Sequence, residues 1–439
     1  MSEQINPRSL VLDILLAVER DGEFSHIAVR QMLDKYRYLP HRDRAFIKRV
    51  SEGTIERQIE LDYIIRQFSK IRVKKMKPVI RAILESGVYQ LFYMDAVPDS
   101  AVCNEAVKLA VTRGFAGLKG FVNGVLRSIA RNREQICWPS PDTEPVQAAS
   151  VRYSMPEWLT ERFFRQFGRE RSIHIFESFY QKHSTCVRVD TARRKPEEVK
   201  KSLETRGITV TPAEGIPEAF WIDGYDALDE IPEFEEGILY VQDISSMMVA
   251  KTALENCSGD GLFALDVCAA PGGKSIHMAQ LFGERGRVEA RDLTEYKAEL
   301  IEENRERCGV ENLCVRVWDA TVFDPSMEGA ADLVIADLPC SRLGVIGSKT
   351  DIKYRVTPEK IGELAALQRQ ILSVVRRYVK DGGILMYSTC TVTEEENQEN
   401  VAWFLQSCPE FSLETERQYL PDEGCDGFYI AKLVRKAAL

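Results

Sequence analysis

The sequence has few of the residues that build disulfide frameworks, structural metal sites or membrane spans. Its eleven cysteines are an odd number with no Cys-x-x-Cys pair, and only five histidines are present. This composition argues against a disulfide framework and a structural zinc site, so we expect no metal. No apolar run approaches the roughly 18 residues that cross a bilayer, and the first ten residues lack the apolar stretch of a signal peptide. We therefore expect a cytoplasmic protein with reduced thiols and no membrane partner.

The charge of the chain is unevenly distributed. The net charge is −9 over 439 residues, which by itself argues against nucleic acid as a partner. Residues 1–140, however, hold 23 Lys and Arg against 16 Asp and Glu, whereas the remaining residues hold 35 against 51. A basic half of this kind is a hint of nucleic-acid binding, although a solvated surface explains it equally well. The densest basic stretch, residues 70–77, allows the same two interpretations: a phosphate contact or a solvated helix end.

Residues 5 to about 135 are predicted to form a helical bundle. Apolar side chains recur there at the three- and four-residue spacing of helices that bury one face. The stripes are Leu10, Val11, Ile14, Leu15 and Val18; Leu61, Ile64, Ile65 and Phe68; Ile80, Ile83, Leu84 and Tyr89; and Phe121, Val122, Val125, Leu126 and Ile129. Three prolines between Trp138 and Pro145 then indicate a linker. We therefore expect an all-α domain over residues 1–140.

The rest of the chain is predicted to contain a small mixed subdomain and an α/β domain. Residues 146–235 combine two helical patterns with one extended segment, which are 158–167, 196–206 and 185–190. Residues 236–439 alternate short apolar runs with helical stretches, which is typical of a parallel sheet with crossover helices. The five strands expected there are Leu262–Val267, Arg287–Ala290, Leu313–Val317, Leu333–Ala336 and Gly383–Tyr387. Because ligands bind such sheets at the carboxyl ends of the strands, the residues after each strand form the candidate site.

The first of these strands is followed by a turn of small residues and paired glycines, Asp266-Val-Cys-Ala-Ala-Pro-Gly-Gly-Lys-Ser275. Such a turn lets the backbone pass close to a ligand at the start of a helix. It is not a phosphate-binding loop, because Cys268 occupies the position five residues before Gly273 where that loop needs a glycine. The chain also lacks the G-x-G-x-x-G motif of dinucleotide enzymes. The turn therefore predicts a nucleoside ligand of another kind.

An acidic residue follows each of the next two strands. Asp292 comes twenty residues after Gly272, a distance suited to bonding ribose hydroxyls. Asp319 stands where a carboxylate accepts bonds from an adenine edge. Glu289 is a weaker candidate because it falls within its strand. One such acid alone is more often a surface residue or a helix cap, but two at successive strand ends favour a ligand site.

Two cysteines follow the fourth and fifth strands: Cys340 in the segment Asp-Leu-Pro-Cys-Ser, and Cys390 in the segment Tyr-Ser-Thr-Cys-Thr. A lone cysteine is usually inert packing, yet both of these stand at the ligand-binding edge of one sheet. The capping-box spacing of Thr393 and Glu396 predicts a helix directly after Cys390, whose amide groups would favour a thiolate. The acids at 394–396 oppose this effect, so the net shift of the thiol pKa stays open.

These segments together resemble the Nop/Sun family of RNA cytosine-5 methyltransferases. The matching segments are Gln242-Asp-Ile-Ser-Ser246, Asp266–Ser275, Asp337–Ser341, Leu367-Gln368, Tyr387–Thr391 and Asp426-Gly-Phe-Tyr429. The resemblance implies a Rossmann-like α/β fold that binds S-adenosylmethionine. It also implies that Cys390 is the nucleophile and that Cys340 assists later steps. The residues that would surround the cofactor are Cys268, Ala269, Ala270, Pro271, Gly272, Gly273, Lys274, Asp292, Asp319 and Asp337.

The N-terminal part adds a second resemblance, to the NusB-type helical RNA-binding domain. It rests on the apolar spacing and on Ser51-Glu-Gly-Thr54, Glu85-Ser-Gly-Val-Tyr-Gln-Leu91 and Phe121-Val-Asn-Gly-Val-Leu126. This domain joined to such a catalytic unit is characteristic of the bacterial Sun/Fmu (RsmB) group, which methylates a cytosine of small-subunit ribosomal RNA. The two resemblances cover nearly the whole chain. They imply 16S ribosomal RNA, and not DNA, as the partner, and we expect a monomer.

The chemistry expected is covalent catalysis. A thiolate that attacks carbon 6 of cytosine turns the ring into an enamine, whose carbon 5 then takes the methyl group. Asp337 is the candidate for assistance at N3, and the base must leave its stack to react. The chain departs from the family in one loop, where Arg342 and Leu343 replace smaller residues and leave the base contacts open.

Three other functions share part of the pattern. A nucleotide-dependent oxidoreductase would share the sheet but would not need the paired cysteines. A non-catalytic RNA-binding or antitermination factor would share the helical part alone. A transfer-RNA cytosine-5 methyltransferase is the nearest alternative, and only the helical N-terminal part argues against it.

Overall fold

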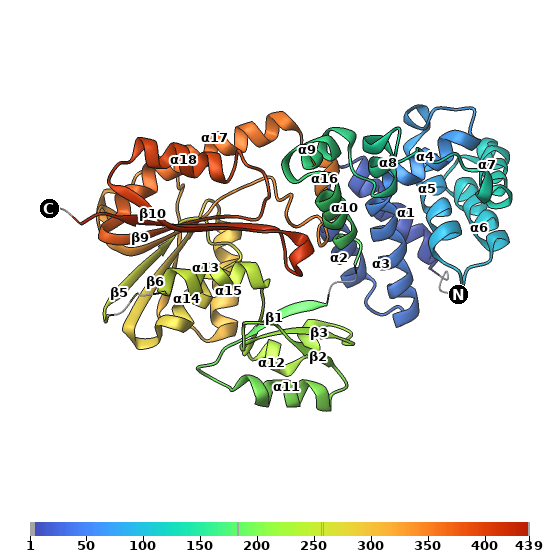
Figure 1. Ribbon diagram of the computed structural model, residues 1–439. Coiled ribbons are helices and arrows are strands. Elements are labelled where there is room, and N and C mark those ends of the chain that lie inside the picture. Colours follow the sequence, from blue (N-terminus) through green and yellow to red (C-terminus); the bar gives the residue numbers. More distant parts are fainter. Residues whose placement is uncertain (1–4, 182–183, 256, 258, 438–439) are drawn as a thin grey trace. The chain divides into compact units, whose positions relative to one another are not determined.

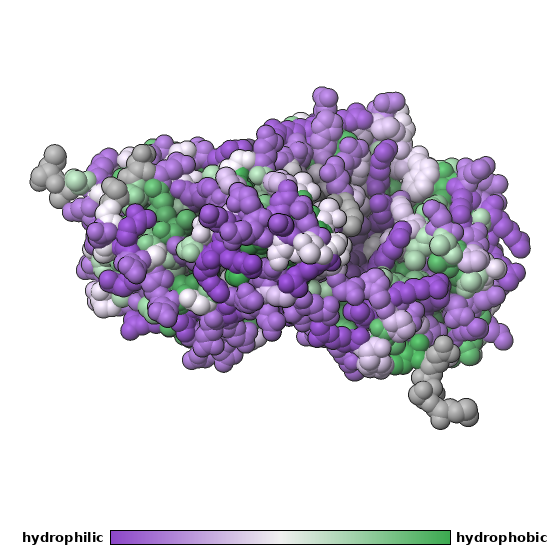
Figure 2. All heavy atoms as spheres, turned by 90° about the horizontal axis from the view of Figure 1, so that it is seen from below, coloured by the Kyte–Doolittle hydropathy of each residue, from purple (hydrophilic) through white to green (hydrophobic). Residues whose placement is uncertain are grey.

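The computed structural model describes residues 5–181, 184–255, 257 and 259–437. These residues form two compact units: one of residues 5–179 with 348–355, and one of the described residues from 180 to 347 with 356–437. Residues 1–4, which belong to the N-terminal segment where the sequence predicts no signal peptide, lie outside the described residues. None of the described helices is both long and apolar enough to cross a membrane. The face drawn in Figure 2 is mainly hydrophilic, with apolar residues in small groups.

The first unit is helical, as the apolar spacing predicts. The four stripes lie in α1, α4, α5 and α7, and most of their side chains are buried in one common core. Asn6 caps α1 by accepting the amide of Arg8 at 3.0 Å, just before a proline at the first helical position. The helices are α1 (Pro7–Glu19), α2 (Ser25–Lys35), α3 (His41–Glu56), α4 (Gln58–Phe68), α5 (Pro78–Tyr93), α6 (Asp99–Thr112), α7 (Lys119–Arg131), α8 (Pro145–Arg152), α9 (Glu157–Phe167) and α10 (Arg169–Ser178).

A segment from far along the chain also packs into this unit. Residues 348–355 end in α16 (Ile352–Arg355), which is orange among the green and blue helices of Figure 1. Asp351 accepts the hydroxyl of Ser25 at 2.6 Å and pairs with Arg355 at 2.6 Å. Because Asp351 is 2% exposed, these partners satisfy a carboxylate that would otherwise be buried without compensation.

The second unit is built around a seven-stranded sheet in the order β10-β11-β9-β8-β5-β6-β7. The five expected strands are confirmed, and all five run parallel. The last two strands, which the sequence analysis missed, form an antiparallel edge. The strands are β5 (Leu262–Asp266), β6 (Gly286–Asp292), β7 (Leu313–Val317), β8 (Ala331–Asp337), β9 (Val379–Thr389), β10 (Phe411–Tyr419) and β11 (Phe428–Arg435).

Helices cover both faces of this sheet, so most side chains of its central strands are buried whichever face they point to. One face carries α13 (Ile244–Leu254), α14 (Gly273–Phe282) and α15 (Glu295–Cys308), and the other carries α17 (Pro358–Val375) and α18 (Gln398–Ser407) (Figure 1). A separate apolar cluster fills the space on each side. The loops at the carboxyl ends of the parallel strands are thereby held on a rigid, two-sided scaffold.

A second, smaller sheet precedes the large one. Its antiparallel order is β2-β3-β1-β4, and only β1 lies in the predicted extended segment. The predicted helix at 196–206 is α11, which packs on this sheet through Val199 and Leu203. The division into 1–140, 146–235 and 236–439 stays a prediction about which parts fold by themselves. The elements are β1 (Thr185–Val189), α11 (Pro196–Thr205), β2 (Thr209–Pro212), β3 (Ala219–Asp223), α12 (Pro232–Glu235) and β4 (Leu239–Val241).

Candidate active site

The turn between β5 and α14 contains a glycine in a left-handed conformation. Gly272 has φ +105°, and a Cβ there would meet the side chains of Ile276 and Ile301 at 3.3 Å. At the end of β5, the buried Asp266 accepts the hydroxyl of Ser275 at 2.6 Å. Burial raises the pKa of Asp266 to about 7, and the bond from Ser275 acts in the opposite direction. The start of α14 is therefore tied to the strand that precedes it.

Asp292 joins this turn to the end of β6. Its carboxylate accepts the amide of Ala270 at 2.9 Å and that of Leu293 at 2.7 Å, and it pairs with Lys297 at 2.8 Å. The side chain is nearly buried. Its carboxylate therefore holds the backbone of the turn in place through the bond from Ala270. Glu289, the weaker candidate, pairs with the buried Arg291 at 2.6 Å and has a structural role of its own.

Asp319 follows β7 and is exposed. Its carboxylate accepts the amide of Thr321 at 2.8 Å and the hydroxyl of the same residue at 2.7 Å. The structure thus links Asp292 to the turn by a hydrogen bond, whereas Asp319 is placed by its own local turn. Asp292 is the last residue of β6 and Asp319 follows β7, so both stand at the carboxyl ends of neighbouring parallel strands.

The two predicted cysteines meet at the ends of β8 and β9. These strands are parallel neighbours, with Asp337 opposite Ser388. The sulfur atoms of Cys340 and Cys390 are 3.3 Å apart, and both residues are partly exposed. The spacing allows one thiol to donate a hydrogen bond to the other sulfur.

Asp337 connects this pair to the cofactor turn. Its carboxylate lies 2.6 Å from the ammonium group of Lys274, the residue after the paired glycines, and accepts the hydroxyl of Ser388 at 3.0 Å. Lys274 also lies 5.2 Å from the centre of the Phe428 ring. The sequence places Lys274 in the cofactor turn but indicates no role for it. In the structure, its ammonium group forms an ion pair with Asp337.

The surroundings of the two thiols shift their pKa values in opposite directions. The hydrogen bond from Cys340 lowers the pKa of Cys390, and the positive charges of Arg342 and Lys274 act in the same direction. Burial and Asp337 oppose this shift. The pKa of Cys340 is raised well above its usual value, because Cys340 is the donor in that bond and is also desolvated. Cys390 is thus the sulfur that carries negative charge more readily.

The prediction of a helix directly after Cys390 is wrong. The next helix, α18, begins only at Gln398. Thr393 and Glu396 do interact, but the threonine hydroxyl donates to the glutamate carboxylate at 2.7 Å instead of capping a helix. The lowered pKa of Cys390 therefore comes from neighbouring side chains and not from helix amide groups.

Glu396 instead fastens the loop that carries Cys340. It is fully buried and accepts the amide of Ser341 at 2.8 Å and the hydroxyl of Ser341 at 2.5 Å. Gln368 of α17 donates to the backbone oxygen of Pro339 at 2.9 Å and to Glu396 at 3.2 Å. From the sequence, Gln368 is only part of a matching segment, and Glu396 is expected to cap a helix and not to hold this loop. No local pattern relates positions so far apart.

Two glycines let three segments approach one another behind the cysteines. Gly344 donates to the backbone oxygen of Cys390 at 3.2 Å, and Gly427 donates to the backbone oxygen of Gly344 at 2.9 Å. A Cβ at Gly344 would stand 1.8 Å from the oxygen of Gly427. Any larger residue at Gly344 therefore forces the two backbones apart.

The loop that departs from the family pattern buries one of its two unusual residues, Leu343, and exposes the other, Arg342. Leu343 is fully buried and belongs to the interior. Arg342 is exposed, and its backbone has the left-handed φ of +61°, which a residue with a side chain adopts at a cost. Within the described residues, its guanidinium forms no ion pair. The larger side chain of Leu343 is thus accommodated in the core, and Arg342 is the residue that alters the open side of the site.

Models of three protein families match the chain. They are the 16S rRNA methyltransferase RsmB/F family over residues 252–434, the NusB family over 5–131, and the ferredoxin-like domain of RsmF/B-like methyltransferases over 155–227. Curated relatives extend the match. A probable ribosomal RNA small subunit methyltransferase B from Bacillus subtilis is 33% identical, with 98% of each chain covered. The chain belongs to the ribosomal RNA small subunit methyltransferase B family. A relative of the same name from Synechocystis is 34% identical over 92% of this chain and 89% of its own.

Solved structures share the fold. The crystal structure of PH0851 has a TM-score of 0.82 at 26% identity and covers 98% of this chain and 99% of that one. A methyltransferase homolog protein from Pyrococcus horikoshii has a TM-score of 0.57 at 26% identity, over 68% of this chain and all of that one. The expected architecture, a NusB-like helical domain followed by a Rossmann-like methyltransferase domain, is confirmed.

Proposed function

We propose that the protein methylates carbon 5 of a specific cytosine in 16S ribosomal RNA through a covalent adduct with Cys390. Family membership supports methylation of ribosomal RNA, and S-adenosylmethionine is the methyl donor. The observation that carries the carbon-5 chemistry is the pair of thiols, Cys340 and Cys390, with sulfur atoms 3.3 Å apart at neighbouring strand ends. A methyltransferase that acts directly on nitrogen or oxygen has no need of two such thiols.

The residues around the turn fit this cofactor. S-adenosylmethionine supplies an electrophilic methyl group on a positively charged sulfur. The carboxylates Asp292, Asp319 and Asp337 stand at or just after the carboxyl ends of three strands at one edge of the sheet, where they favour a cationic nucleoside. The residues that we assign to the cofactor are Cys268, Ala269, Ala270, Pro271, Gly272, Gly273, Lys274, Asp292, Asp319 and Asp337.

The attack begins at Cys390. Its sulfur forms a bond to carbon 6 of the cytosine, and the electrons of the ring double bond move to carbon 5, which then takes the methyl group. Asp337 is the residue that we assign to the N3 side of the ring. The ammonium group of Lys274, 2.6 Å from its carboxylate, orients Asp337 for that contact. Arg342 and Lys274 favour the charged form of the attacking sulfur.

Release of the product is the role that we assign to Cys340. The proton on carbon 5 must leave, and the bond between carbon 6 and the Cys390 sulfur must break, which restores the ring double bond. The Cys340 thiol passes its proton to the departing sulfur and receives the proton from carbon 5. One proton per turnover then returns to solvent when Cys390 ionises again.

Methylation of unmodified RNA tests the proposal. Purified protein, labelled S-adenosylmethionine and unmodified 16S ribosomal RNA are incubated. Liquid chromatography against standards identifies the methylated nucleoside, and mass spectrometry of RNase fragments gives its position. We expect 5-methylcytosine at one position. Transfer RNA in a parallel reaction should stay unlabelled. Label in transfer RNA alone, or on an atom other than carbon 5, contradicts the proposal.

A further inference from the structure

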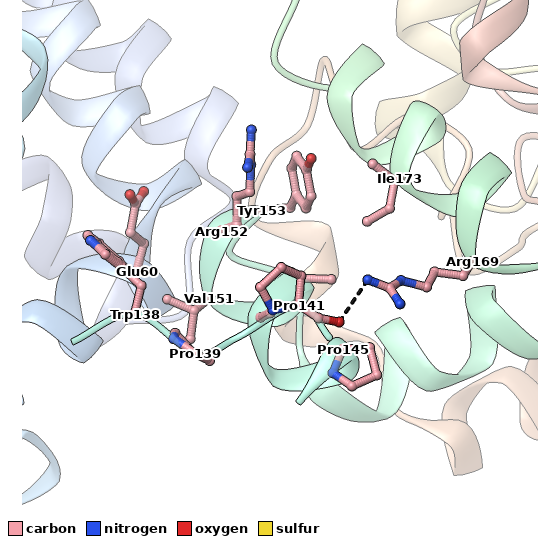
Figure 3. A pocket seen from close by; sticks show the side chains of 12 residues that line it. Glu60, Trp138, Pro139, Pro141, Pro145, Val151, Arg152, Tyr153, Arg169 and Ile173 are labelled. Carbon is pink, nitrogen blue, oxygen red and sulfur yellow. Dashed lines mark hydrogen bonds between the residues drawn. The ribbon is translucent and has the colours of Figure 1, made fainter. Parts of the chain in front are cut away.

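A cavity in the helical unit lies outside the site described above. Its volume is about 580 Å³, within the size range of small-ligand sites. Its walls come from the linker after α7, from α8 and from α10, with Glu60 of α4 at one end (Figure 3). No residue that we assign to the cofactor or to the reaction lines it. The methyl-transfer chemistry therefore gives no reason for this cavity.

An exposed aromatic ring forms one wall. Trp138 is 47% exposed, and its ring stacks on that of Tyr63 in α4, with 6.0 Å between the centroids and 15° between the planes. The guanidinium of Arg66 lies 4.7 Å from the centre of the Tyr63 ring. Gln67 accepts the amide of Cys137 at 2.9 Å, which fixes the backbone beside Trp138. Flat rings held in this way are the surfaces on which single-stranded nucleic acids stack their bases.

Two arginines line the cavity. Arg152 and Tyr153 lie along one side of it, opposite the prolines of the linker, and Arg169 lies at the far end (Figure 3). Within the described part of the chain, Arg152 forms no ion pair, and Arg169 donates to the backbone oxygen of Pro141 at 2.7 Å. Glu60, an acid in the lining, is neutralised by Arg57 at 2.9 Å. The uncompensated charge of the lining is therefore positive.

We propose that this cavity binds an unstacked nucleobase of the RNA substrate against Trp138, with the adjoining phosphates near Arg152 and Arg169. The inference rests on the proposed function, because it takes the substrate to be RNA. The basic stretch 70–77 follows α4, the helix that carries Tyr63, so positive charge continues along the same unit. Single-stranded RNA fits better than a duplex, since a base enters only after it leaves its stack.

The protein side of the test removes the ring. Trp138→Leu keeps an apolar side chain but no flat surface, so affinity for RNA should fall between about fivefold and a hundredfold. Tyr38→Leu is the matched control, because Tyr38 is 71% exposed on the same unit and does not line the cavity. Filter binding measures both variants with a single-stranded fragment of small-subunit ribosomal RNA that contains the methylated cytosine.

The RNA side of the test removes one base at a time. At one position near the target, an abasic nucleotide should weaken binding to the unaltered protein but not to Trp138→Leu. Arg152→Gln should reduce the slope of affinity against salt by about one, and it serves as a second variant if Trp138→Leu does not fold. Arg30→Gln, an exposed arginine of α2, should leave the slope unchanged.

The outcomes separate this proposal from the function on which it rests. If the unaltered protein methylates the RNA while Trp138→Leu and Arg152→Gln bind it equally well, the cavity proposal is overturned and the function stands. A cavity that takes a peptide instead would give that same result. If the unaltered protein methylates no RNA, the proposed function fails first.

Discussion

The sulfur atoms of Cys340 and Cys390 lie 3.3 Å apart, although fifty residues separate them in the chain. Two parallel neighbouring strands bring them together, because both strands end at the same edge of the sheet. The hydrogen bond between them is directional in its effect: it lowers the pKa of Cys390 and raises that of Cys340. This asymmetry supports the different roles that we propose for two chemically identical side chains.

Substitution of each cysteine should give different products. Cys390→Ala should abolish methylation and form no covalent RNA adduct. Cys340→Ala should still allow attack and methyl transfer but should stall release, so a protein–RNA species accumulates that survives denaturing gel electrophoresis and disappears on RNase treatment. Cys314→Ala, at an exposed free cysteine of the same unit, should behave as the unaltered protein does. A stalled adduct with Cys390→Ala would make Cys340 the attacking thiol.

Arg342→Ala, which removes a positive charge, should shift the midpoint of the pH dependence of methyl transfer to higher pH. Only the thiolate attacks, so the rate rises with pH through the pKa of Cys390, and loss of a nearby positive charge raises that pKa. Single-turnover methyl transfer measured between about pH 6 and pH 9, around the ordinary thiol pKa, gives the midpoint.

Matched substitutions at the same position separate charge from backbone strain. Arg342→Gly should shift the midpoint as Arg342→Ala does, but it should not destabilise the fold, since φ +61° suits glycine. Arg342→Lys should keep the midpoint of the unaltered protein. Equal midpoints in all three variants would show that Arg342 does not act on the thiol.

Asp292→Asn should weaken the binding of S-adenosylmethionine. The change removes the negative charge from the end of β6 and breaks the ion pair with Lys297, which is 2.8 Å away. Calorimetry should show the loss in affinity, whereas Asp381→Asn, at an exposed ion pair of β9, should bind as before. Undiminished affinity in Asp292→Asn, or tight binding of NADH in its place, would reverse the cofactor assignment.

Neutralisation of Lys74, Lys75 and Lys77 together should weaken RNA binding and flatten its salt dependence. All three side chains are exposed beside a short 3-10 turn, where they are free to contact phosphates. Binding isotherms at several salt concentrations give the slope, and the affinity for S-adenosylmethionine should not change. Removal of Lys195, Lys200 and Lys201 provides a control with the same change in charge. If the two triple variants bind RNA alike, the stretch is a solvated surface.

Asp351→Ala should destabilise the helical unit by roughly 2–4 kcal/mol, because it leaves a buried network without its carboxylate. Ser25 and Arg355 each lose a partner at 2.6 Å. Urea unfolding followed by circular dichroism measures the change. Asp34→Ala should cost less than about 0.5 kcal/mol, since its pair with Arg30 is 3.6 Å long and exposed. Similar losses in both variants would mean that segment 348–355 is not anchored as described.

The sequence predicted the parts of the fold that depend on nearby residues. Alternation of short apolar runs and helical stretches located β5 to β9, because strands that are covered on both faces are rich in apolar residues. The order of the motifs then located the turn at Gly272 and both cysteines, since whatever follows a parallel strand lies at one edge of the sheet. The same local logic failed after Cys390. The spacing of Thr393 and Glu396 fits a helix cap, yet Glu396 bonds to Ser341, 55 residues earlier.

By itself, therefore, the sequence determined the helical and α/β halves, the candidate residues and the kind of ligand. Only the tertiary structure decided how these residues act on one another: that Lys274 pairs with Asp337, that the sulfur atoms of Cys340 and Cys390 come within hydrogen-bond distance, and that residues 348–355 pack into the helical unit. The reason is physical. The direction of a side chain within a helix or strand follows from its immediate neighbours, whereas a hydrogen bond or ion pair between distant segments depends on how the whole chain packs.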